Sequence, residues 1–241
     1  MSEELRRRLR EGGPEELAVL LAAHEAELGP EEALAALANP HLDIAGIERV
    51  AAQPRLRAAY EVRRALALHP RSPEVLARRF LTALYWRDLT AAGADLRLRP
   101  GLRRAADQLL GERLPGLSPG ERIAIARRAG GGLIGRFAQE RDPRVFAALL
   151  ENPRLTEGSL LPMIHRERLS AEVLAVVAAD PRWGARYPVR LALVRNPATP
   201  PQVALRLLPQ LKKSDLRAVA RDLRLPELVR RRADLLGGPS I

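Results

Sequence analysis

The sequence predicts an all-α protein: an α-solenoid of short, stacked helices that contains an internal duplication. Residues 42–109 match residues 169–236 without a gap, with 30 identities in 68 positions at an offset of 127. In addition, Ala and Leu recur at three- and four-residue spacing along most of the chain, as they do on the buried face of a helix. A duplicated helical unit of this size buries its apolar face against a neighbouring unit, which is how repeat proteins are built.

The helices are expected to be short and separated by prolines. Proline suits the first turn of a helix and breaks its interior, so the prolines that fall between apolar-periodic stretches mark the turns. No stretch shows the period-two alternation with β-branched residues that is typical of strands. We expect about fifteen to seventeen helices of roughly ten residues each. The clearest stretches are residues 31–38, 74–84, 145–150, 172–179 and 202–211.

The middle of the chain carries helix-boundary signals and the predicted division. Ser118-Pro-Gly-Glu121 is a capping box that opens a helix running to Arg128, and the glycines at 130–132 end that helix. We divide the chain into two helical-repeat halves, residues 1–111 and 112–241, which we expect to form one continuous solenoid. Residues 112–141 either continue the stack rigidly or act as a hinge, because Pro-Gly pairs and the triple glycine interrupt them.

A smaller unit recurs inside the large one. Four times an Ala-rich helix ends in a polar residue followed by proline, at Asn39, His69, Asn152 and Asn196. The residue before a proline is disfavoured in the α conformation, so it marks the turn, where its side chain can bond free backbone groups.

The turn pattern carries a family resemblance. Val-x-x-Ala-Leu-x-x-Asn-Pro-x-Thr-Pro at residues 189–200 resembles the leucine-rich repeat variant, a helical solenoid unit. Asp142-Pro-Arg-Val145 and the Val-Arg pairs at 62–63 and 189–190 are similar to HEAT-type repeats. The resemblance covers residues 31–110 and 142–236 and implies an armadillo-like superhelix, a right-handed stack with a curved groove. Founding leucine-rich repeat variant proteins also carry a cysteine-ligated Fe–S segment, whereas this chain has no cysteine.

Composition excludes several classes of chemistry. Without cysteine there are no disulfides, thiolate metal sites or cysteine nucleophiles. The four histidines show no pairing at helical spacing, and we expect neither a metal nor a cofactor. No apolar run approaches the roughly 18 residues of a membrane span. The first residues also lack the apolar segment of a secretory signal. We therefore expect a cytoplasmic protein that does not insert into a membrane.

The chain is arginine-rich, with a net charge of +11 and only two lysines. Such a charge attracts polyanions, which are nucleic acid, acidic proteins or anionic membrane surfaces. Codon usage in a GC-rich genome explains the same arginines as solvated helix faces, and both interpretations stay open. The candidate polyanion- or partner-binding residues lie on or just after helices that follow the x-Pro-x-x-Pro turns: Arg78, Arg79, Arg206, Lys212, Lys213 and Arg217.

Candidate catalytic residues are few. The aspartates at 88, 95 and 107 recur in the second copy at 215, 222 and 234. Acid–base catalysis would need a cleft that raises a carboxyl pKa. We interpret these aspartates instead as helix caps that pair with nearby arginines. Tyr60 and Tyr187 share one position, where we expect a buried ring whose hydroxyl bonds the backbone.

Three functions follow from these observations. The first hypothesis is a non-enzymatic interaction scaffold that presents a curved groove to a protein partner. The alternative is a basic HEAT-like protein that binds duplex nucleic acid through Arg/Lys–phosphate contacts. Single-strand binding is not expected, since aromatic residues are only 3% of the chain and could not build stacking platforms. The third hypothesis is an enzyme resembling DNA-repair glycosylases, with Trp86 and Asp88 as the local candidates. The oligomeric state and the partner's identity stay open.

Overall fold

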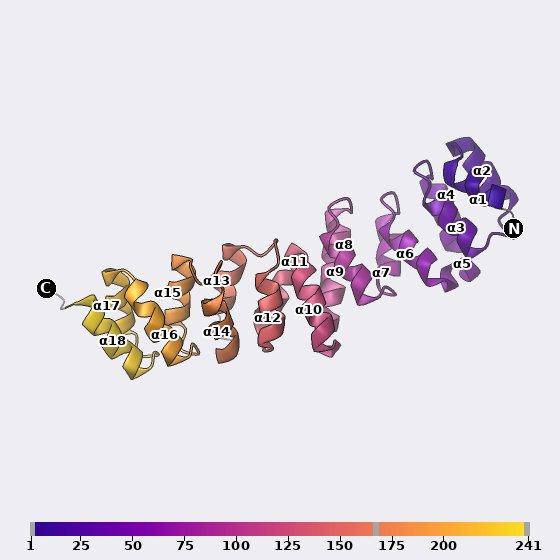
Figure 1. Cartoon of the computed structure of the whole chain (residues 1–241). Helices are drawn as coiled ribbons and strands as arrows, with labels where there is room; N and C mark the ends of the chain where they lie inside the picture. Colours follow the sequence, from indigo (N-terminus) through magenta and orange to yellow (C-terminus); the bar gives the residue numbers. More distant parts are fainter. Residues whose placement is uncertain (1–2, 166–168, 239–241) are drawn as a thin grey trace. The chain divides into compact units, whose positions relative to one another are not determined.

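The computed structural model describes residues 3–165 and 169–238 (Figure 1). All regular structure in these two ranges is helical, with eighteen α-helices, three 3-10 helices and no strand, which confirms the all-α prediction. There are more α-helices than expected because two of them, α5 (Pro54–Ala58) and α11 (Gly131–Ile134), have only five and four residues. The chain forms two compact units, Met1–Glu112 and Arg113–Ile241.

Unit 1 is built from the first nine helices. In this unit α1 packs against α3, α3 against α6 and α2 against α4, so that alternate helices lie side by side. Their facing positions are leucine, alanine, isoleucine and valine that are almost fully buried. Besides α5, the helices are α1 (Glu3–Glu11), α2 (Pro14–Ala23), α3 (Pro30–Leu37), α4 (Ile44–Ala52), α6 (Tyr60–Leu68), α7 (Glu74–Leu81), α8 (Trp86–Ala94) and α9 (Pro100–Arg113).

Unit 2 repeats this arrangement. Here α10 packs on α12 and α12 on α14, while α13 packs on α15, α15 on α17 and α16 on α18. Besides α11, its helices are η1 (Leu114–Gly116), α10 (Pro119–Arg128), η2 (Gly135–Gln139), α12 (Pro143–Leu150), α13 (Glu157–His165), α14 (Ala171–Ala179), α15 (Tyr187–Arg195), α16 (Pro201–Leu207), η3 (Leu208–Gln210), α17 (Lys213–Arg221) and α18 (Glu227–Gly237).

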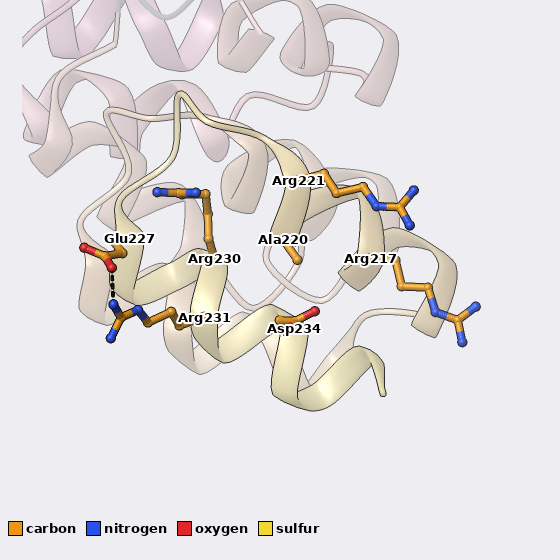
Figure 2. Close-up of a pocket in the computed structure, with 7 residues that line it drawn as sticks. All are labelled: Arg217, Ala220, Arg221, Glu227, Arg230, Arg231 and Asp234. Carbon is orange, nitrogen blue, oxygen red and sulfur yellow. Dashed lines mark ion pairs between the residues drawn. The ribbon is translucent and has the colours of Figure 1, made fainter. Parts of the chain in front are cut away.

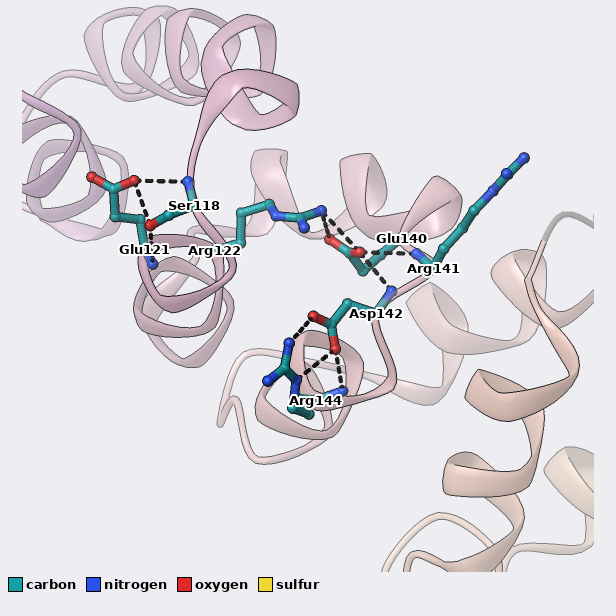
Figure 3. Close-up of polar contacts among 7 residues, drawn as sticks. All are labelled: Ser118, Glu121, Arg122, Glu140, Arg141, Asp142 and Arg144. Carbon is teal, nitrogen blue, oxygen red and sulfur yellow. Dashed lines mark hydrogen bonds and ion pairs between the residues drawn. The ribbon is translucent and has the colours of Figure 1, made fainter.

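Local signals set the helix boundaries as the sequence predicted. Seven α-helices begin with proline, because its fixed φ suits the first turn and its missing N–H would have no partner there. The capping box before α10 is present: Ser118 N donates to Glu121 Oε2 at 2.8 Å, and Glu121 N donates to Ser118 Oγ at 3.4 Å (Figure 3). The helix ends at Arg128 as predicted, and the triple glycine leads into α11.

The Asn-Pro turns connect helices of neighbouring repeats. The buried Asn152 side chain donates from Nδ2 to the carbonyls of Ala126 (2.8 Å) and Ala129 (3.2 Å), and Oδ1 accepts from Arg154 N at 2.8 Å. This one side chain therefore provides hydrogen-bond partners for two carbonyls at the end of α10 and for a backbone N–H group of its own turn. Asn39 and Asn196 make the same kinds of contact with earlier helices.

The fourth of these residues, His69, is confirmed as a turn residue, since its Nδ1 accepts from Arg71 N at 3.1 Å. Burial, reinforced by the charge of Arg71, lowers the pKa of His69 below its ordinary value of 6.5.

A buried carboxylate orders the approach to α12 (Figure 3). Glu140 accepts two hydrogen bonds from Arg122 Nη1, at 3.0 and 2.8 Å, and its Oε1 also accepts from the backbone N–H groups of Arg141 and Asp142. Asp142 is the N-cap of α12 and accepts from Arg144 N at 2.9 Å. The Arg144 guanidinium lowers the pKa of Asp142 to about 2. This polar cluster is engaged in holding the fold together.

Candidate partner-binding groove

The positive charge of the protein lies in one unit. Residues 1–112 contain 17 arginines and 17 acidic residues, so unit 1 is formally neutral. Residues 113–241 contain 23 basic and 12 acidic residues and carry the whole net charge of +11. Charges counted over the whole chain do not reveal this asymmetry, although a count by halves does. Unit 2 is therefore the unit in which to look for an anionic partner.

The six predicted binding residues fall in both units. Arg78 and Arg79 belong to α7 in unit 1, where Arg78 pairs with Glu74 at 2.8 Å. Arg206 is exposed in the last turn of α16. The backbone N–H of Lys212 donates to the hydroxyl of Tyr187 at 3.1 Å. The side-chain ammonium of Lys212 lies 5.2 Å from the centroid of the Tyr187 ring. Lys213 opens α17 and is exposed, while Arg217 follows one turn later.

Of these six, Arg217 lines a groove of about 340 Å³ between α17 and α18 (Figure 2). Three further arginines line the same groove and were not among the predicted residues. The full lining is Arg217, Ala220 and Arg221 from α17, and Glu227, Arg230, Arg231 and Asp234 from α18.

Helical spacing places these side chains on facing surfaces. The four groove residues of α18 are spaced i, i+3, i+4 and i+7, which puts them on one side of the helix. The buried positions of α18 are Val229, Ala233 and Gly237 on the other side, while Leu216 and Val219 are buried in α17. Arg230 is fixed at the groove edge, because its Nε donates to Leu225 O at 3.2 Å.

The guanidinium groups surround the groove and do not meet at one point. Figure 2 shows Ala220 and Asp234 in the middle, with Arg217 and Arg221 reaching out on one side. Arg230 and Arg231 extend on the other side, where Arg231 forms an ion pair with Glu227. Positive groups separated in this way can bind charges spread along an extended partner better than they can enclose one small anion.

The two sequence copies differ at this groove. Ala220 and Asp234 correspond to Gly93 and Asp107 in the first copy. Asp107 is buried, and a Cβ built on Gly93 would clash with its Oδ1. Ala220 carries that Cβ, and Asp234 is exposed and lines the groove. Glycine at position 93 therefore leaves the space that the buried Asp107 occupies, whereas Ala220 fills the equivalent space in the second copy.

An exposed apolar strip accompanies the groove. Leu228 and Leu235 of α18 are 60% and 75% exposed, and their i, i+7 spacing puts them on one face beside the groove residues. Their counterparts in the first copy are Gly101 and Gln108. Large apolar side chains exposed next to arginines are typical of protein–protein contact surfaces.

The duplicated tyrosines and aspartates form helix junctions. Tyr60 donates to Oδ2 of Asp88 and accepts from the backbone N–H of Tyr85 at 3.0 Å, so the predicted hydroxyl–backbone bond is confirmed. The ring is only partly buried, contrary to the prediction. Arg64 Nε donates to Oδ1 of Asp88 at 2.6 Å. Both oxygens of this candidate catalytic carboxylate are thus engaged in structural contacts. The ring of Trp86 is covered by the Arg87 guanidinium, whose Cζ lies 5.2 Å from the ring centroid.

The prediction that Asp95 and Asp222 cap helices is wrong in one respect. Each follows a helix, α8 or α17, and so stands at a C-terminal end. Each does pair with the arginine two residues later, as predicted, and Arg97 lowers the pKa of Asp95 to about 2. Their carboxylates organise turns, where an acceptor for a backbone N–H is needed.

Comparison with protein-family models, with curated proteins and with solved structures finds no match for this chain. Within residues 3–165 and 169–238, no three His, Asp or Glu side chains are grouped so that they could hold a metal ion. Among those same residues, no helix has both the length and the apolar character needed to cross a membrane.

Proposed function

We propose that this chain is a non-enzymatic helical-repeat scaffold, an α-solenoid of the HEAT or leucine-rich repeat variant kind, that binds a protein partner. The partner segment docks in the groove between α17 and α18 and carries acidic and apolar side chains. One observation carries this proposal: four arginines surround Asp234 in a groove that runs beside the exposed Leu228 and Leu235.

The lining favours a macromolecule over a small molecule. Six of its seven residues are charged and the seventh is alanine. Pockets that hold small molecules are mostly apolar and aromatic, with a few polar groups. Arginines at a groove edge next to leucines are the residue types that contribute most to protein–protein recognition.

The carboxylates in the groove favour a protein over a phosphate chain. Asp234 in the middle and Glu227 at one side would repel a nucleic-acid backbone that passed along the groove. A protein segment can present acidic side chains to the arginines and a backbone N–H or a basic side chain to Asp234. It can also cover Leu228 and Leu235, which a phosphate chain cannot.

Duplex nucleic acid is the second candidate, supported by the concentration of charge in unit 2. Six exposed basic side chains there make no hydrogen bond, ion pair or ring contact with any described residue. Such groups can neutralise phosphates and release counterions. They are Arg128, Arg136, Arg141, Arg206, Lys213 and Arg232.

Two fluorescent probes, poly-L-glutamate and a random-sequence DNA duplex, distinguish these functions by anisotropy. The groove variant is Arg217→Glu/Arg221→Glu, and the matched control is Arg128→Glu/Arg136→Glu, which has the same net charge. We expect the groove variant to bind poly-L-glutamate about tenfold more weakly than the control does. Equal weakening in both variants, or no binding of the probe by the wild-type chain, would contradict the proposal. Strong DNA binding by the wild-type chain that weakens steeply between about 50 and 200 mM salt, and that is reduced more in the Arg128→Glu/Arg136→Glu variant than in the groove variant, would establish the second candidate.

A further inference from the structure

We propose that the partner segment in the α17–α18 groove is helix α2 of a second copy of this chain. The inference rests on the proposed function of the groove and names its occupant. It predicts a head-to-tail contact in which unit 2 of one copy binds unit 1 of the next.

The segment that contains the first three helices is negatively charged, whereas the groove is positively charged. Residues 3–37 contain nine acidic residues and four arginines, so this segment is acidic within a unit that is neutral as a whole. Several of the acids are neutralised inside the unit, as Glu16 is by Arg8 at 2.7 Å. Glu11 and Glu15 are exposed, and their side chains have no hydrogen bond or ion pair with any described residue. Together with Glu3, which is exposed and likewise has no such partner among the described residues, they are the acids that remain available to a partner.

Helix α2 presents Glu15 beside an apolar surface, and Glu11 ends the preceding helix α1. The buried side of α2 consists of Leu17, Leu20 and Leu21. The exposed positions are Glu15, Ala18, Val19, Ala22 and Ala23, which occupy the opposite side of the helix. Val19 is 66% exposed. The small alanines around it leave room for bulky side chains of another helix.

The two surfaces complement each other in charge and in side-chain size. Leu228 and Leu235 are large and exposed, and the alanines and Val19 offer an apolar surface for them. Arg217 and Arg221 lie on one side of the groove. Glu11, at the end of α1, and Glu15, in the first turn of α2, carry the charge that complements them. An amphipathic helix placed in a groove is a recurrent mode of recognition.

Charge also selects the symmetry of the contact. Two basic grooves repel each other and so do two acidic α2 surfaces, which disfavours a two-fold interface at either site. The pairing of unlike surfaces is heterologous and leaves one free groove and one free α2 surface on every dimer. Association of this type adds further copies unless the geometry closes a ring.

The full chain and two blocked variants test this contact by light scattering after size-exclusion chromatography. The groove is blocked by Arg217→Glu/Arg221→Glu and the α2 surface by Glu11→Ser/Glu15→Ser/Val19→Ser. We expect the average mass of the wild-type chain to rise with concentration and to fall when salt screens the charges. Each variant alone should be monomeric. An equimolar mixture should form dimers only, because each variant supplies the surface that the other lacks. Formation of that dimer also shows that both variants fold.

A wild-type chain that stays monomeric at high concentration and low salt would overturn the inference, as would a mixture that stays monomeric. Association that persists in the groove variant alone would overturn it as well, since another surface would then be responsible. A monomeric wild-type chain whose groove still binds poly-L-glutamate would remove this inference and leave the proposed function standing. A wild-type chain that neither self-associates nor binds poly-L-glutamate would contradict both the inference and the proposed function.

Discussion

Tyr187 donates its phenolic hydrogen to the carboxylate of Asp215, which ties the start of α15 to the first turn of α17. The same hydroxyl accepts from the backbone N–H of Lys212 at 3.1 Å. Tyr60 and Asp88 make the matching contact between α6 and α8. The duplication has therefore preserved a contact between helices as well as the helices themselves. The arginines beside the two aspartates, Arg64 at Asp88 and Arg195 at Asp215, lie at different turns of α6 and α15.

We predict that Tyr187→Phe destabilises unit 2 by about 1 kcal/mol, because two hydrogen bonds at a partly exposed site are lost. Urea unfolding followed by Trp183 fluorescence measures this effect. The measurement uses a Trp86→Phe background, which leaves Trp183 as the single tryptophan. Ser214→Ala, an exposed change next to Asp215 in α17, is the control and should alter the free energy by a few tenths of a kcal/mol at most. Equal effects of the two substitutions would contradict the structural role of the hydroxyl.

The same bond has a defined pH dependence. Burial raises the pKa of Tyr187 above its ordinary value of 10.0, and the hydrogen bond to Asp215 adds to the rise. A raised pKa in the folded state means that the contribution of the protonated hydroxyl is complete below pH 10.0 and is lost as the pH rises through the folded-state pKa. The stability difference between the wild-type chain and Tyr187→Phe should therefore be constant at neutral pH and decline only in alkaline solution.

We predict that Asn152→Ala destabilises unit 2 by about 2–4 kcal/mol, because two carbonyls and one N–H lose their partner beside a buried side chain. The Trp183 unfolding assay measures the change. The neighbouring Glu151→Ala removes only an exposed ion pair with Arg127, so it serves as the control and should cost less than about 1 kcal/mol. A cost of Asn152→Ala as small as that of the control would show that water replaces the amide at this turn.

We predict that exchanging glycine and alanine destabilises the equivalent positions 93 and 220 for different physical reasons. Gly93→Ala should destabilise the packing of α8 on α9 by about 1–3 kcal/mol, because the new methyl group displaces the buried Asp107. Ala220→Gly creates no clash and should cost only the difference in helix propensity, about 1 kcal/mol. Hydrogen exchange of the two helix pairs measures both effects. Unchanged protection of α8 and α9 in Gly93→Ala would refute the account of how the two copies diverged.

Features that depend on neighbouring residues could be predicted from the sequence. The capping box at Ser118, the turn at Asn152 and the pairing of Asp95 with Arg97 join groups two or three residues apart, whose approach is fixed by covalent spacing. The helical period and the prolines likewise predicted an all-helical chain. The helix count was too low because periodicity detects poorly any helix as short as α5 or α11.

The candidate site was predicted only in part. Arg217 was selected, whereas Arg221, Arg230 and Arg231 were not, because nothing local distinguishes a groove arginine from a solvated one. The concentration of charge in unit 2 could have been found by counting each half.

By itself, the sequence determined the helices, their turns, the duplication and the charge of each half, since these follow from composition and from spacing along the chain. The tertiary structure decided which surfaces face one another. Tyr187 meets Asp215 across 28 residues, and Asp234 reaches solvent where its counterpart Asp107 is buried. The physical reason is that such contacts depend on how each helix is rotated and packed against its neighbour. At Gly93 a single added methyl group would collide with the buried Asp107, which shows how closely this packing depends on side-chain size.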